Sequence, residues 1–128
     1  MDSNLFERKN FLDGNWIMTN PADIFSSKII GQYIVLTVNL IRATANEAEI
    51  LRKYLTNFPK DTEKTIVVDL SKCNFVDSTF LSGIISYNKH TNSEIRLVVS
   101  DRRQLAILKI TKIDSLFKIY LDIDQAMV

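Results

Sequence analysis

The pattern of apolar and polar residues is clearest between residues 65 and 90, where a near-continuous apolar run is followed by a segment with helical spacing. The first part, residues 65–71, includes Ile66, Val67, Val68 and Leu70. Such a run is typical of a strand that is buried on both faces, and such strands occur mainly in parallel sheets covered by helices. It therefore predicts an interior strand of a parallel sheet.

The next segment, residues 78–90, has the spacing of an amphipathic helix. Its apolar face is formed by Phe80, Leu81, Ile84, Ile85 and Tyr87. Asp77 precedes this face and is a residue type preferred at the N-cap. The pattern predicts that the buried strand leads into a helix whose first turn carries Ser78 and Thr79.

The remaining elements follow from the same periodicities. The expected strands are a pair within residues 24–38, then 94–100 and 117–120; the expected helices are 45–57 and 101–110, with a last helical turn at 123–127. Thr44 and Glu47 form a capping-box pattern before the first helix, and Pro59 ends it. Gly31 and Gln32 separate the first two strands. Strands and helices then alternate, which predicts an α/β fold with a mixed sheet.

Residues 1–22 follow this pattern less closely. Two short apolar stretches flank Asp13 and Gly14, which is a hairpin-turn sequence, and Asn20 and Pro21 interrupt the pattern afterwards. We expect an N-terminal extension at 1–22, either an extra strand or hairpin or a loose arm, followed by one domain at 23–128.

Composition limits the class of protein. A chain of 128 residues with 46% hydrophobic and 24% charged residues is typical of one globular domain. A net charge of +1 gives no strong field for nucleic acid or an acidic membrane, so we expect neither as a partner. The chain starts with Met1 and Asp2 without a secretory pattern, and it has no long apolar run, which predicts a cytoplasmic protein.

The residues needed for common catalytic and cofactor sites are not arranged as such sites require. His90, the only histidine, falls at a predicted helix end, where a structural role is expected. Cys73, the only cysteine, follows a buried strand and is expected to be an apolar filler. The three glycines form neither a phosphate-binding loop nor a dinucleotide fingerprint. We therefore expect no catalytic residues, no metal, no cofactor and no enzymatic activity.

The Asp77, Ser78 and Thr79 step remains as the candidate site. The first N–H groups of a helix lack intrahelical acceptors and carry partial positive charge, so a carboxylate or an added phosphate is stabilised there. Residue types alone favour a cap followed by two polar residues in the first turn, an arrangement that any protein can use.

The segment VDSTFLSGII at 76–85 resembles the signature of the STAS domain, typified by bacterial anti-sigma factor antagonists. The usual form is Asp-Ser-Ser/Thr-Gly-Leu-Gly after a buried strand; Phe80 and Ser82 stand where that form has glycines. The resemblance extends over residues 24–127. It implies a STAS-like mixed sheet of about four to six strands, with helices packed mainly on one side.

In that family the serine after the aspartate is phosphorylated by an anti-sigma factor that is also a protein kinase. The resemblance places this role on Ser78, with Thr79 as a secondary candidate. It implies a partner-switching module that binds an anti-sigma factor/serine kinase and is released by phosphorylation, with a phosphatase as a further partner. The residues expected to bind the partner are Asp77, Ser78, Thr79, Phe80, Leu81 and Ser82. The oligomeric state stays open between a monomer and a weak homodimer.

Two other functions are compatible with the sequence. The first is a scaffold or assembly subunit of a bacterial signalling complex that works without phosphorylation, with Phe80 either buried or exposed as an interface anchor. The second is an enzyme or ligand carrier with a pocket at the carboxyl ends of the strands.

Overall fold

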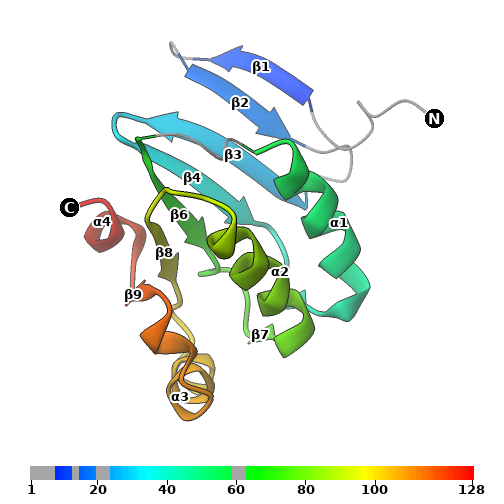
Figure 1. Ribbon diagram of the computed structural model, residues 1–128, viewed down its shortest axis with the longest axis vertical. Helices are drawn as coiled ribbons and strands as arrows, with labels where there is room; N and C mark the ends of the chain where they lie inside the picture. The colour runs from blue at the N-terminus through cyan, green and yellow to red at the C-terminus, as the bar shows by residue number, and fades with distance from the viewer. Residues whose placement is uncertain (1–7, 13–14, 20–23, 59–62) are drawn as a thin grey trace.

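A mixed sheet organises the molecule in the computed structural model, which describes residues 8–12, 15–19, 24–58 and 63–128. Seven of the described strands form this sheet, in the spatial order β1 (Arg8–Leu12), β2 (Asn15–Thr19), β3 (Phe25–Ile30), β4 (Tyr33–Val38), β6 (Thr65–Asp69), β8 (Ile95–Val98) and β9 (Lys118–Tyr120). Neighbouring strands are antiparallel from β1 to β4 and parallel from β4 to β9 (Figure 1).

The predicted α/β class is confirmed. Five strands come from residues 24–128, within the expected four to six, and β1 and β2 extend the same sheet. β6 lies between β4 and β8 and is parallel to both, as its apolar run predicted. The turn expected at Asp13 and Gly14 and the break at Asn20 and Pro21 lie outside the described residues, as do Pro59 and the polar residues that follow it.

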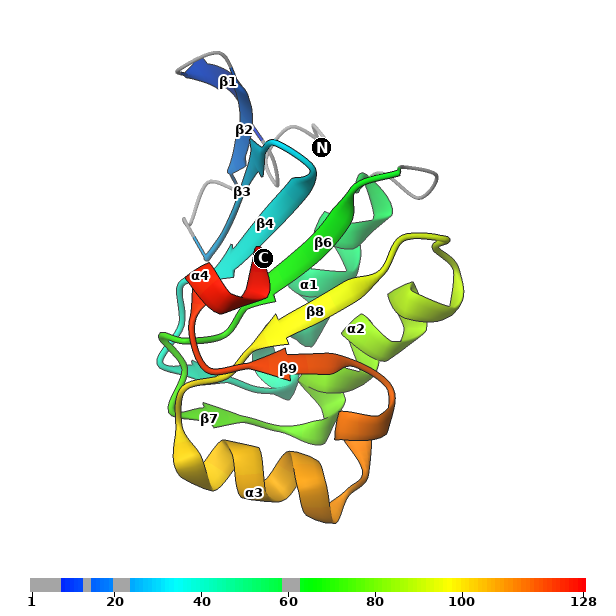
Figure 2. The same ribbon diagram turned by 90° about the vertical axis from the view of Figure 1, so that its left-hand side faces the viewer.

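The helices lie mainly on one face of the sheet. They are α1 (Ala45–Thr56), α2 (Ser78–Lys89), α3 (Arg102–Ile110) and the short α4 (Ile123–Ala126), with a 3₁₀ turn, η2 (Ile113–Ser115), after α3. Figure 2 shows α1 and α2 behind the sheet and α4 in front of it. Alternate residues of the central strands therefore enter two separate cores.

The larger core lies under α1, α2 and α3. It includes Leu36 of β4, Val68 of β6 and Leu97 of β8, which are 0–2% exposed. The smaller core lies under α4 and contains Val35, Val67, Val98 and Ala126. Burial of β6 on both faces explains why its sequence is almost continuously apolar.

Local signals locate the helix starts correctly. Thr44 and Glu47 form both halves of the capping box of α1, and Asp77 and Asp101 are the N-caps of α2 and α3. Gly31 has a φ of +58° in the two-residue turn between β3 and β4, a conformation that glycine adopts without strain. Two very short strands, β5 (Arg42–Ala43) and β7 (Phe75–Val76), pair in parallel and were not predicted.

Candidate functional site at the start of α2

The start of α2 is held in place by the β5–β7 pair. Asp77 N–H donates to the carbonyl of Ala43 at 3.0 Å, directly beyond the last residue pair of this two-stranded sheet. The loop that precedes α1 is thereby joined to the loop that precedes α2. Both helices then run side by side in the same direction over the sheet (Figure 1).

The Asp77 carboxylate caps two helices. Its Oδ1 accepts the N–H of Phe80 at 2.8 Å, which is the expected N-cap bond of α2. Its Oδ2 accepts the N–H of Ala45, the first residue of α1, at 2.9 Å. One side chain therefore satisfies donors at the positive ends of two adjacent helices.

The hydroxyl-bearing residues of this helix start are accessible. Ser78, Thr79 and Ser82 are exposed. Ser82 Oγ donates to the Thr79 carbonyl at 2.6 Å, whereas the hydroxyls of Ser78 and Thr79 make no hydrogen bond within the described part of the chain. The structure thus leaves the Ser78 oxygen available to solvent next to the positive end of α2.

Phe80 and Leu81 were expected to contact the partner, but their side chains are buried. Phe80 is 0% exposed and packs against Phe25 with ring centroids 6.2 Å apart, and Leu81 is 3% exposed. Their positions on the helix direct both side chains into the core beneath α2. Of the two alternatives for Phe80, burial and exposure as an interface anchor, the structure shows burial, and neither side chain offers a surface to a partner.

Sequence reasoning missed a second set of surface residues beside this helix start. Ile41 is 66% exposed, and the guanidinium carbon of Arg42 lies 4.4 Å from the centre of the Phe75 ring. The Ile41 carbonyl accepts the N–H of Asn74 at 2.8 Å, so this loop stays against β7. No local sequence signal marks these residues, because the β5–β7 pairing brings them together across more than thirty positions.

The other candidate residues have the structural roles that were expected. His90 is exposed at the C-cap of α2, with its ring Nδ1 2.8 Å from the Ser86 carbonyl. Cys73 is 3% exposed. Burial, assisted by the Asp69 carboxylate, raises the pKa of its thiol to about 11 and keeps it protonated at neutral pH.

The space under the start of α2 is almost filled. A cavity of about 10 Å³ is lined by Leu70, Cys73, Val76, Leu81 and Gln104 among others, room for a single water at most. A groove of about 300 Å³ lies instead near the opposite ends of α1 and α2, beside Arg52 and His90.

Among residues 8–12, 15–19, 24–58 and 63–128, no group of three or more potential metal ligands occurs, and no helix is long and apolar enough to cross a membrane.

The fold and this site define an α/β domain in which a doubly capping aspartate precedes an exposed serine at a helix start. The model of the STAS domain family matches residues 29–126, and the chain belongs to that family. No curated protein matches the sequence.

Two solved structures share the fold. One, from Thermotoga maritima, is provisionally assigned as an anti-sigma factor antagonist; it is 24% identical, with a TM-score of 0.67 over 80% of this chain and 91% of that chain. The other is an anti-sigma factor antagonist from Mycobacterium paratuberculosis, 17% identical, with a TM-score of 0.69 over 85% of this chain and 95% of that chain. At these identities the likeness establishes the common fold.

Proposed function

We propose that the protein is a partner-switching module of the anti-sigma factor antagonist type, which works by binding and catalyses no reaction. The unmodified protein binds an anti-sigma factor that is also a serine kinase, and phosphorylation of Ser78 ends that binding. The observation that carries this proposal is the exposed Ser78 hydroxyl, which directly follows the shared Asp77 cap and has no hydrogen-bond partner among the described residues. Thr79, also exposed, is the secondary acceptor.

The effect of a phosphate at Ser78 on the fold is expected to be small. It would add about −1.5 to −2 charges beside the positive ends of α1 and α2, which is favourable, and beside the Asp77 carboxylate, which is unfavourable. Because these two effects oppose each other and Ser78 faces water, the folded structure should persist.

Binding responds differently to the same phosphate. A phosphate dianion in the interface must lose its hydrating water and is repelled by any carboxylates of the partner. Each 1.4 kcal/mol of this cost weakens binding about tenfold. The partner surface would comprise Ser78, Thr79 and Ser82 together with the neighbouring Ile41 and Arg42. Asp77 would contribute by holding α1 and α2 together.

Mass spectrometry tests the modification. The purified protein is incubated with ATP and a kinase of the anti-sigma type from the same organism, and Ser78→Ala, Thr79→Ala and the double variant are treated in parallel. We expect phosphate on Ser78 in the wild type and its loss in Ser78→Ala. Phosphate found only at other residues would contradict the proposal.

A binding measurement separates switching from constitutive scaffolding. Ser78→Asp is expected to weaken kinase binding at least tenfold, whereas Ser86→Asp, at an exposed position two turns further along α2, should not. Equal binding by wild type and Ser78→Asp would favour the scaffold function. We further propose that a phosphatase removes the phosphate from Ser78 and so restores binding, and that the protein works in the cytoplasm.

A further inference from the structure

A second surface lies at the far edge of the sheet, between α3 and β9. A groove of about 590 Å³ there is lined by Leu105 and Lys109 of α3, by Asp114 and Phe117 before β9, and by the residues 118–121. Figure 2 shows α3 below β9, on the side away from β8. This groove is formed by other elements than those that carry Ser78.

The β9 strand forms an edge of the sheet. It pairs with β8 on one side, and within the described residues no strand pairs with its other side. An edge strand presents unpaired backbone N–H and C=O groups that can accept an added strand. The groove therefore adjoins backbone groups that suit an extended polypeptide.

Apolar side chains are exposed around this edge. Leu121 and Leu116 are 55% and 51% exposed, and on α3 Ile110 is 79% and Ile107 40% exposed. Of these four residues, Leu121 lines the groove, whereas Ile107 and Ile110 lie on other sides of α3 than Leu105 and Lys109. Leu121 therefore adds an exposed apolar side chain to the groove, as is common at interaction surfaces.

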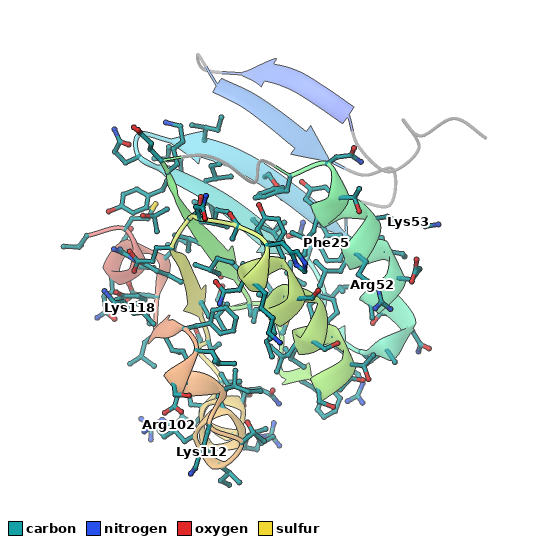
Figure 3. All side chains as sticks on the ribbon, in the orientation of Figure 1. Phe25, Arg52, Lys53, Arg102, Lys112 and Lys118 are labelled. Atoms are coloured by element: carbon teal, nitrogen blue, oxygen red, sulfur yellow. The ribbon has the colours of Figure 1, made fainter. Side chains whose placement is uncertain are left out.

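The same segment is strongly basic. Residues 102–118 carry five basic side chains and one carboxylate, Asp114, a net charge of +4, and this segment is flanked by Asp101 on one side and by Asp122 and Asp124 on the other. Arg102, Lys109 and Lys112 are exposed and make no ion pair within the described part of the chain. Figure 3 shows Arg102 and Lys112 at the end of the molecule formed by α3.

We propose that this edge docks an extended, acidic segment of a partner protein, in which carboxylates alternate with apolar side chains. Its backbone would pair with β9, and its apolar side chains would enter the groove beside Leu105 and Phe117. Its carboxylates would meet Lys109 and also Lys118, whose ammonium group lies 3.5 Å from Glu94 Oε2. Charge complementarity selects this occupant. A second copy of the chain would bring two segments of net charge +4 together, and Lys118 on the edge strand opposes such pairing.

Peptide titration tests the proposal. The full chain, labelled with ¹⁵N, is titrated with capped hexapeptides that carry Glu at alternate positions and Val, Leu, Ile or Phe between them. We expect saturable shifts of the amide signals of Ile119 and Leu121. Peptides with Gln in place of Glu should bind at least tenfold more weakly, because they keep the shape and lose the charge.

Two matched substitutions make the test specific to this edge. Leu121→Asp and Lys109→Glu should each weaken binding of the Glu peptides about tenfold or more. The controls Ile30→Asp and Lys28→Glu, at exposed positions of β3, should leave it unchanged. Circular dichroism checks that each variant is folded.

Three outcomes would overturn the proposal. The first is no shift at β9, or equal shifts with the Glu and Gln peptides. The second is co-sedimentation with phosphatidylserine vesicles that Leu121→Asp abolishes, which would assign the surface to a membrane. The third is a dimer in analytical ultracentrifugation that Leu121→Asp dissociates, which would assign it to a second copy of the chain.

Discussion

The Asp77 carboxylate accepts the backbone N–H of Ala45, 32 positions earlier in the chain, at 2.9 Å. The same carboxylate caps α2 through Phe80 N–H at 2.8 Å. This single side chain therefore connects the starts of two neighbouring helices, and the residue after it is the proposed phosphorylation site. The signature aspartate has a structural function that is separate from any contact with a partner.

Removal of this double cap should destabilise the protein more than removal of a single cap. Asp77→Ala loses hydrogen bonds to two helix starts, and we expect the free energy of unfolding to fall by about 2–3 kcal/mol. Asp101→Ala, which affects only the start of α3 at Arg103 and Gln104, should cost about 1 kcal/mol. Urea unfolding measures both, and equal losses would show that the bond to Ala45 contributes little.

Because α1 and α2 pack closely, a larger residue at Gly83 should destabilise the protein. A Cβ atom at Gly83 would lie 3.1 Å from Leu51 Cδ2, and Leu51 is 0% exposed. Gly83→Val should therefore lower the free energy of unfolding by about 1–3 kcal/mol through overpacking. Adding Leu51→Ala creates space, so the double variant should be more stable than the sum of the two single effects predicts. Strict additivity of the three unfolding measurements would contradict this account.

The buried thiol predicts a pH dependence of stability. The pKa of Cys73 in the folded protein is about 11, above its ordinary value, because burial and Asp69 disfavour the thiolate. The protonated thiol is the favoured form, so its contribution is complete below the ordinary pKa and is lost as pH rises toward 11. Between these values the wild type should lose up to about 1.4 kcal/mol per pH unit relative to Cys73→Ala.

Thiol labelling provides an independent measurement of the same property. At pH 8, Cys73 in the native protein should react with a disulfide reagent far more slowly than in urea, because it is 3% exposed and protonated. Similar rates in the two conditions would mean that the thiol is accessible in the native state.

The C-terminal helix α4 should depend on Arg96. The Arg96 guanidinium donates to the Ala126 carbonyl at 2.8 Å and lies 5.8 and 5.7 Å from the ring centres of Tyr33 and Tyr120. Arg96→Ala should therefore speed hydrogen exchange in residues 123–127 by at least tenfold while α2 is unaffected. Arg103→Ala, which removes only an exposed pair with Asp101 at 3.8 Å, serves as the control and should change neither region.

The main elements could be predicted because their signals are local. The apolar run of β6 reports burial on both faces, and the spacing of Leu81 and Ile84 reports the buried side of α2. Helix ends were equally accessible, since Asp77 and Thr44 are capping residue types followed by helical spacing. Both helices begin where these signals placed them.

Parts of the candidate site could not be predicted in the same way. Phe80 occupies a helix position whose burial depends on the packing of Phe25 from β3, far away in sequence. Ile41 and Arg42 reach the site only through the pairing of β5 with β7. These two strands contain two residues each, too few for a periodic pattern to be recognised.

By itself, the sequence determined the α/β class, the strand that leads into α2, and the position of two hydroxyls in its first turn, because these depend on residues within a few positions of one another. Only the tertiary structure decided that Asp77 caps α1 as well as α2, that Phe80 packs against Phe25, and that β9 is an edge strand among the described residues. Each of these depends on which distant segments become neighbours, and that choice is made by the packing of the whole sheet and its helices.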